Sequence, residues 1–268
     1  MNRSSSRPGF PARLDLGGGN RPAGTPQRSV PRPSARPDGA GFDLPMTLPV
    51  PRDPVPARAR MVQLLAAGGV RDEQVLRAMG AVDRHHFVDS ALVPQAYEDT
   101  ALPIGLGQTI SKPSVVARMT ELLMQGGLRG PDGRLGRVLD IGTGCGYQAL
   151  VLAQLASEVY SIERLRELHE KARALLRPLR VPNIHLILGD GMVGFERGAP
   201  YAGIIAAAGG AAIPDTWVDQ LAEGGRLVAP VEQGAGAQAL VVIDKTRQGI
   251  HRSVLEAVNF VPLKSGIA

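Results

Sequence analysis

The chain has 268 residues, of which 44% are hydrophobic, and its formal net charge is +5. This length and composition suffice for one large α/β domain with a sizeable core. A single cysteine, Cys145, excludes an internal disulfide, and no run approaches the 18 apolar residues of a transmembrane helix.

The positive charge is concentrated at the N-terminus. Residues 1–60 hold 10 Lys and Arg against 4 Asp and Glu, together with 12 of the 22 prolines, whereas residues 61–268 hold 20 against 21. A segment so poor in apolar residues cannot offset its ordering entropy, so we predict a disordered Pro/Arg-rich tail over 1–56. The tail lacks the apolar core of a secretory signal. The nearly neutral body argues against a broad phosphate-binding face.

An N-terminal helical cap is expected to open the folded domain, which we place at 57–268. Apolar residues at helical spacing predict two helices interrupted at Gly68 and Gly69. A further helix is expected from Pro113 to Leu123, so that 57–125 holds the N-terminal helices and the loop before the third. The adjacent His85 and His86 have no third ligand at a suitable spacing, so no metal site is predicted.

Strands and helices alternate over residues 136–268. The expected strands cover 137–141, 158–162, 184–188, 202–207, 225–229 and 239–243, and helices are expected over 164–179 and 213–225. An additional strand is expected within 253–263. This alternation predicts a Rossmann-like doubly wound sheet with its ligand at the carboxyl ends of the strands.

The stretch RVLDIGTGCGYQAL, residues 137–150, predicts a strand, a glycine turn and a helix. Its N–H groups and helix N-terminus favour a polar or anionic ligand. The glycines, Gly142, Gly144 and Gly146, are spaced G-x-G-x-G around Thr143 and Cys145, and Tyr147 stands where a dinucleotide fingerprint has its third glycine. No Gly-Lys-Ser/Thr follows, which excludes a Walker loop. Cys145 is interpreted as a packing residue, since no nearby histidine could activate it.

Three acidic residues follow expected strands. Glu163 could accept from a ribose diol, Asp190, with Gly191 beside it, could accept from an adenine amino group, and Asp140 could face a sulfonium or ammonium group. A pyrophosphate would be repelled by this acidic lining, whereas the net-positive methionine end of S-adenosylmethionine would be attracted. S-adenosylmethionine is therefore the predicted cofactor.

The segment AYEDTALPIGLGQTISKPSVVARMTELL, residues 96–123, carries the most unusual loop. Ser111 is suited to be a helix N-cap, with Pro113 near the first turn. The same loop, with Thr109 and Ile110, could present hydroxyl and amide N–H groups to an anion. Both interpretations stay open on these residues alone.

This segment, together with VLDIGTGCGYQAL, ILGDG, QLAEGGRLVAPV and the terminal FVPL, closely resembles the protein-L-isoaspartate O-methyltransferase family. The resemblance runs from about Arg58 to Leu263. The glycine turn alone would indicate only a class I S-adenosylmethionine-dependent methyltransferase, and GQTIS is the discriminating motif. Two positions depart from the family pattern: Gly209-Gly210 where a proline-containing turn is usual, and Asp83 where proline is common.

The resemblance implies an enzyme of protein repair that methylates the free α-carboxylate of L-isoaspartyl residues in damaged proteins and peptides. It places the active-site serine at Ser111, with Thr109 and Ile110 as further substrate-binding residues. We expect a cytoplasmic enzyme, monomeric, with no nucleic-acid or membrane partner. Two alternatives stay open: a class I methyltransferase with a small-molecule or RNA acceptor, and a non-catalytic binding protein that holds nucleic acid with its basic tail.

Overall fold

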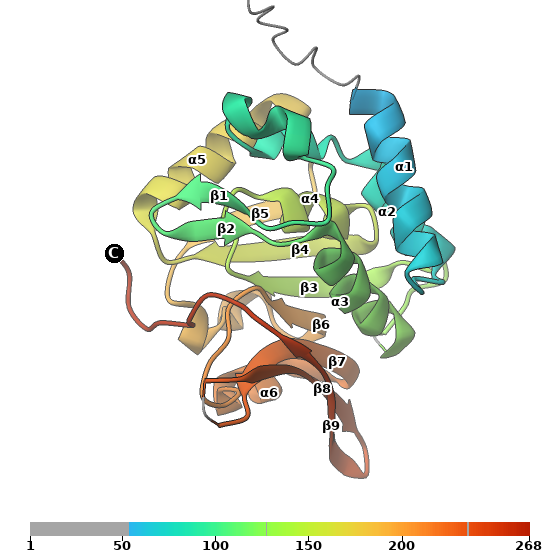
Figure 1. The fold of residues 1–268 in the computed structure, drawn as a ribbon. Coiled ribbons are helices and arrows are strands. Elements are labelled where there is room, and N and C mark those ends of the chain that lie inside the picture. Colours follow the sequence, from blue (N-terminus) through green and yellow to red (C-terminus); the bar gives the residue numbers. More distant parts are fainter. Residues whose placement is uncertain (1–53, 127, 235) are drawn as a thin grey trace, which may run out of the picture. The chain divides into compact units, whose positions relative to one another are not determined.

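The centre of the molecule is a seven-stranded sheet with the strand order β5-β4-β3-β6-β7-β8-β9 (Figure 1). The computed structural model describes residues 54–126, 128–234 and 236–268. Strands β3 to β7 pair in parallel, and β8 and β9 add an antiparallel edge. A separate two-stranded hairpin, β1-β2, lies outside this sheet. No helix in the described ranges combines the length and apolar character needed to cross a membrane.

The strands are β1 Leu102–Gly105, β2 Gln108–Ile110, β3 Leu135–Ile141, β4 Ala156–Glu163, β5 Ile184–Leu188, β6 Tyr201–Ala206, β7 Leu221–Glu232, β8 Gln238–Thr246 and β9 Gly249–Val258. The α-helices are α1 Pro54–Ala67, α2 Glu73–Ala81, α3 Pro113–Gly126, α4 Tyr147–Ala153, α5 Arg166–Leu176 and α6 Asp215–Gln220. Short 3-10 helices are η1 Arg84–Phe87, η2 Ser90–Gln95, η3 Arg177–Leu179, η4 Gly191–Val193 and η5 Glu196–Gly198.

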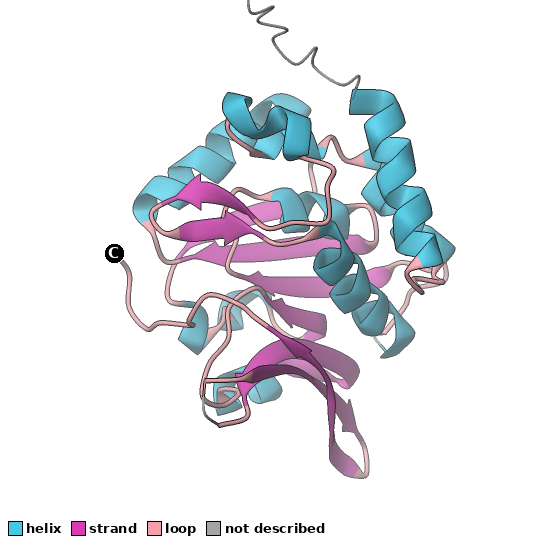
Figure 2. Ribbon diagram, viewed as in Figure 1, coloured by secondary structure: helices cyan, strands magenta, loops and turns pink. Residues whose placement is uncertain are grey.

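Helices cover both faces of the sheet, as Figure 2 shows. Helices α1 to α5 contribute to one apolar cluster with residues such as Val138 and Val159. Alternate strand residues, among them Leu139 and Ile141, point to the opposite face, where they pack with Trp217 of α6. Two covered faces explain why a central parallel strand such as β6, YAGIIA, is buried along its whole length rather than on alternate residues.

The predicted Rossmann-like doubly wound α/β architecture is confirmed, and each of the six main predicted strands overlaps an observed one. The helix expected over 213–225 is shorter. It ends at Gln220, because Leu221 to Gly225 already belong to β7, which pairs with β6. The expected last strand is β9, which ends at Val258.

The expected tail over 1–56 lies outside the described residues except for its last three. Those three belong to α1, which begins at Pro54 rather than at 57. Arg58 of this helix forms an ion pair with Asp83, the position at which the family more often has proline. The start of α1 is therefore tied to the segment that follows α2.

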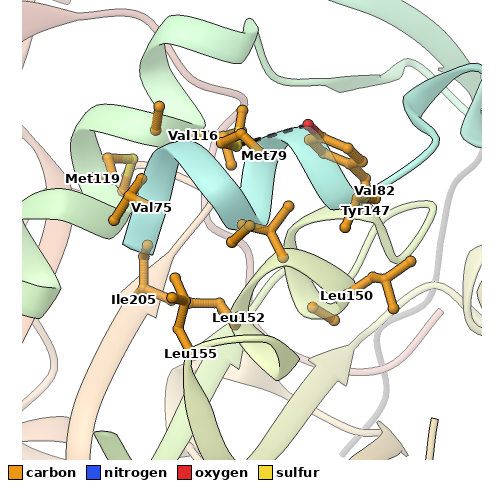
Figure 3. Close-up of a cluster of buried hydrophobic side chains, with 14 of the residues drawn as sticks. Val75, Met79, Val82, Val116, Met119, Tyr147, Leu150, Leu152, Leu155 and Ile205 are labelled. Carbon is orange, nitrogen blue, oxygen red and sulfur yellow. Dashed lines mark hydrogen bonds between the residues drawn. The ribbon is translucent and has the colours of Figure 1, made fainter. Parts of the chain in front are cut away.

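The core beside the cofactor-binding sheet is built where α2, α3 and α4 meet (Figure 3). Met79 and Tyr147 lie close together, with the Tyr147 hydroxyl 3.8 Å from the Met79 sulfur. Phe87 packs edge-on against the same tyrosine ring at a centroid distance of 5.7 Å. The helices of the N-terminal cap thus share the main core.

A buried polar network joins β3, β4 and α4 at the carboxyl end of β3. Asp140 is 0% exposed, and its two carboxylate oxygens accept from Ser161 Oγ at 2.7 Å and from Gln148 Nε2 at 2.8 Å. Thr143 Oγ1 lies 2.7 Å from Ser161 Oγ and donates to it, because the serine proton is committed to Asp140. Burial raises the pKa of the Asp140 carboxyl to about 6. The hydrogen bonds from Ser161 and Gln148 lower this pKa, but the effect of burial is larger.

The raised pKa makes Asp140 a source of pH-dependent stability. The folded protein holds the Asp140 proton more tightly than the unfolded chain, so this contribution is present at low pH and is lost as pH rises from about 4 to about 6. Asp140→Asn cannot titrate. Relative to wild type, its free energy of unfolding should therefore rise over that interval, by roughly 1.4 kcal/mol for each unit of pKa shift. Urea unfolding at several pH values checks this, and a constant difference would contradict it.

Candidate cofactor and acceptor site

A cavity of about 460 Å³ opens at the carboxyl ends of β3 and β4. This volume is within the usual range for small-molecule sites. The residues that line it are Ile104, Leu106, Gly107, Gln108, Thr109, Ile141, Gly142, Gly144, Ile162, Glu163, Arg164, Leu165, Leu168, Gly191, Ala207, Ala208, Val261, Pro262, Leu263 and Lys264. Of the residues predicted from the sequence, the cavity brings together Thr109, Gly142, Gly144, Glu163 and Gly191.

The glycine turn forms one wall of this cavity. Gly142, Gly144 and Gly146 all have positive φ, at 93°, 55° and 92°. Residues other than glycine rarely adopt such φ values. Gly146 caps α4 in the left-handed conformation, and a Cβ there would lie 2.8 Å from Leu176 Cδ1. The three glycines are therefore required by the backbone path, and Gly146 acts through packing rather than by lining the cavity.

Glu163 fixes the turn as well as lining the cavity. Its Oε2 accepts from the Gly144 backbone N–H at 2.9 Å, and its Oε1 accepts from the Leu165 N–H at 2.9 Å. Each oxygen keeps a further lone pair for a ligand hydroxyl. The carboxylate is thus held by two backbone donors in one orientation at the end of β4.

Asp190 lies at the edge of the cavity rather than in its lining. Its Oδ1 accepts from Met192 N–H at 2.8 Å and its Oδ2 accepts from Gly266 N–H at 2.6 Å. The neighbouring Gly191 does line the cavity, and a Cβ there would lie 2.7 Å from Ile141 Cγ2. Asp190 therefore ties the C-terminal segment to the strand end that carries Gly191.

Three other predicted cofactor residues point away from the cavity. Asp140 and Thr143 belong to the buried network described above, in which both Asp140 carboxylate oxygens already accept a hydrogen bond, and the contact of Asp140 with a methionine end stays a prediction. Tyr147 is buried beneath Arg84, and burial raises the pKa of its phenol to about 12. Cys145 is also buried, which raises the pKa of its thiol and agrees with a packing role. The sequence places them in the turn but does not show which way their side chains point.

The serine loop, residues 109–112, joins β2 to α3 beside the cavity. Thr109 lines the cavity, Ile110 is buried, and Ser111 is half-buried. Within the described ranges, no hydrogen-bond partner exists for the Ser111 hydroxyl. Its carbonyl accepts at 2.8 Å from Arg84 Nη2. The hydroxyl is therefore free for a ligand, while the backbone behind it is anchored.

The expectation that Ser111 caps α3 is wrong. The helix begins at Pro113, and the Lys112 carbonyl accepts the first helical hydrogen bond, from Val116. The cap comes from Asp99, whose carboxylate accepts from both the backbone N–H and the hydroxyl of Ser114 at 2.8 Å. Helix capping thus places no demand on the Ser111 side chain.

Two walls of the cavity were not identified from the sequence. The β1-β2 hairpin covers it, and Lys171 of α5 donates to the Ile104 carbonyl at 2.8 Å. Ala207 and Ala208, which follow β6, form another part, and the only signal for them was their place after an apolar strand. For the hairpin, the only sequence signal was the Gly105-Leu106-Gly107 turn, which weakly indicates a β-hairpin.

The Gly209-Gly210 departure lies next to Ala208, where hydrogen bonds replace the rigidity of a proline turn. Gly209 pairs with the C-terminal segment, since its N–H donates to Val261 O at 2.9 Å and its carbonyl accepts from Leu263 N–H at 2.7 Å. The Gly210 carbonyl accepts from Glu232 N–H at 3.0 Å. A Cβ at Gly209 would lie 2.6 Å from Gln238 Nε2, so a larger residue would have to displace the amide that hydrogen-bonds the Phe260 backbone.

The lining fits S-adenosylmethionine in its polar groups and in its apolar surface. The Glu163 carboxylate can accept from hydroxyls, and the closely approaching glycine backbone leaves room for a ligand against the turn. Ile141, Ile162 and Leu168 supply apolar surface for a flat ring. The site therefore combines a nucleoside-sized cavity with a free serine hydroxyl at its margin.

The family model for protein-L-isoaspartate(D-aspartate) O-methyltransferase matches residues 57–268. A protein-L-isoaspartate O-methyltransferase of Methylibium petroleiphilum is 53% identical, over 97% of this chain and 96% of that protein. Another, of Leptothrix cholodnii, is 61% identical over 78% of this chain and 74% of its own length. The match therefore extends over the whole catalytic region.

Solved structures agree. One protein-L-isoaspartate O-methyltransferase aligns with a TM-score of 0.70 and 26% identity, covering 78% of this chain and 67% of that one. A Plasmodium falciparum protein named for the same activity, in complex with S-adenosyl-L-homocysteine, aligns with a TM-score of 0.66 and 26% identity, over 77% of this chain and 98% of that one. The chain belongs to the protein-L-isoaspartate(D-aspartate) O-methyltransferase family and is a repair methyltransferase whose methyl donor is S-adenosylmethionine.

Proposed function

We propose that methyl transfer to the isoaspartyl α-carboxylate takes place where the serine loop meets the cofactor cavity, with Ser111 orienting the acceptor. The observation that carries this proposal is the shared lining: Thr109 of the loop lines the same cavity as Glu163 and the glycine turn. Ser111 is two residues from Thr109. A carboxylate held at Ser111 would therefore lie next to the bound donor.

The donor side rests on Glu163, Gly142, Gly144 and Gly191. Glu163 accepts from the ribose hydroxyls, and its two backbone contacts keep both oxygens in place for this. Asp190 supports the adenine end by holding the chain around Gly191. S-adenosylmethionine, when bound, supplies an electrophilic methyl group. Asp140, Thr143, Gly146 and Tyr147 act by fixing the turn and α4.

The acceptor side requires orientation rather than a base. A carboxylate with a pKa of roughly 4 is ionised at neutral pH and serves as its own nucleophile. The free Ser111 hydroxyl donates to one carboxylate oxygen and, with Thr109 and Ile110, directs the other toward the methyl group. Arg84, which is fully buried, fixes this loop through the Ser111 carbonyl and also donates to Ala96 O at 2.8 Å. Methyl transfer would then form an ester on the carboxylate, break the bond between the methyl carbon and the donor sulfur so that S-adenosyl-L-homocysteine leaves, and leave the serine unmodified.

Location, assembly and further partners stay predictions. We propose a cytoplasmic monomer without a nucleic-acid partner. The absence of a nucleic-acid partner is supported by the charge of residues 61–268, where 20 basic residues are balanced by 21 acidic ones. The relatives offer no support for a small-molecule or RNA acceptor.

The first test concerns the donor. Glu163→Gln removes the charge and turns one accepting oxygen into an N–H donor, so S-adenosylmethionine affinity should fall by about 1 to 3 kcal/mol. Calorimetric titration of the folded variant measures this. The exposed Glu167→Gln, on α5, is the matched control and should bind as wild type does. Unchanged affinity of Glu163→Gln would remove this residue from the site.

The second test concerns the acceptor. Ser111→Ala should change the free energy of unfolding by no more than about 0.5 kcal/mol, because Asp99 and not Ser111 caps α3. Turnover on an isoaspartyl peptide should fall by roughly tenfold to a few hundredfold, which is the loss expected when one hydrogen bond that positions the acceptor is removed. Cofactor affinity should be retained. The exposed Ser90→Ala serves as control, and wild-type turnover by folded Ser111→Ala would refute the role.

A further inference from the structure

A second cavity, of about 810 Å³, lies on the other side of the serine loop. We refer to it as the α1–α3 groove. Its walls come from α1 (Met61, Leu64, Leu65), from the start of α3 (Pro113, Ser114, Val115) and from the end of β9 (Ala257, Val258). None of the residues that line this groove also lines the cofactor cavity.

Two chain segments border both the α1–α3 groove and the cofactor cavity. Thr109 lines the cofactor cavity, and Pro113 and Ser114 line the groove, with Ser111 between them. Val258 lines the groove, and Val261 lines the cofactor cavity. The serine loop and the chain after β9 therefore form the boundary between the two. An acceptor held at Ser111 would lie at this boundary, with the groove beginning directly beside it.

We propose that the α1–α3 groove binds the polypeptide on one side of the isoaspartyl residue and prefers apolar side chains there. The inference rests on the proposed function, since it takes the acceptor carboxylate to lie at Ser111. An isoaspartyl substrate is a polypeptide, so its flanking residues have to leave the site along the protein surface. The groove is the concave path that starts at the serine loop.

The preference for apolar side chains follows from the partners of the charged groups in the groove. Arg118 is bound on both sides, by Glu256 at 2.9 Å and by Glu121 at 3.2 Å. Asp99 is occupied by Ser114. Arg118, Glu121 and Glu256 thus satisfy one another and Asp99 is occupied by Ser114, so among the described lining residues only the exposed Arg71 guanidinium is left to a charged ligand.

Leu64, by contrast, is 58% exposed on the groove wall, near Leu65 and Met61 of the same helix. An apolar side chain placed against Leu64 would remove this surface from water. The groove thus offers apolar contact as its main unused interaction.

The test compares wild type with Leu64→Asp on two isoaspartyl peptides: a short one flanked by single alanines and a longer one flanked by leucine and valine. Leu64→Asp should raise KM for the longer peptide about tenfold, the effect expected for losing contact with one buried apolar side chain. The increase for the short peptide should be clearly smaller. Because Leu64 is exposed, the substitution should leave folding intact.

Leu179→Asp is the matched control. Leu179 is 42% exposed on η3 and lines neither cavity, so both KM values should equal those of wild type. Leu64→Met, which keeps the apolar surface, should retain the wild-type KM for the longer peptide.

Equal KM ratios for the two peptides would overturn the proposal. It would also be overturned if Leu64→Asp dissociated a wild-type dimer, since a second copy would then occupy the groove. Failure of the serine-loop proposal looks different: Ser111→Ala would then turn over the short peptide at the wild-type rate.

Discussion

The hydrogen bond from the Gly144 N–H to Glu163 is the interaction on which the cofactor site depends. It joins the turn after β3 to the end of the neighbouring strand β4, at 2.9 Å. The turn can follow this path only because three glycines accept positive φ. The same carboxylate lines the cavity, so one residue both shapes the turn and faces the space proposed for the donor. Donor recognition and local backbone geometry are therefore inseparable here.

The acceptor side is organised on a different principle. The serine loop is held from behind, by the buried Arg84 at the Ser111 carbonyl, while Asp99 caps the helix that follows. Burial lowers the pKa of Arg84, because a buried cation loses its hydration. Its position over the Tyr147 ring, 4.8 Å from the centroid, offsets part of this cost. The loop is thus anchored to the same core that supports α4 and the glycine turn.

Sequence reasoning predicted the sheet, the glycine turn and the strand-end position of Glu163, because apolar periodicity carries that information, whereas Thr109, which lines the same cavity as Glu163, came only from the family resemblance. It could not tell that Asp140 and Tyr147 point into the core, since adjacent turn residues differ only in direction. Asp99 as the α3 cap was missed because it lies fifteen residues before its partner Ser114. The β1-β2 hairpin was missed because its strands are too short for a clear alternation.

The central claim is that a free α-carboxylate on an isoaspartyl residue is oriented beside the donor at the serine loop. It is tested most directly by methyl transfer from S-adenosylmethionine to two peptides of the same sequence, one with L-isoaspartate and one with normal L-aspartate at a single position. Both peptides carry the same charge and the same flanking side chains, so only the placement of the carboxylate differs. The account predicts methylation of the isoaspartyl peptide and none of its normal twin. Equal rates on both, or no transfer to either by folded protein with bound donor, would contradict it.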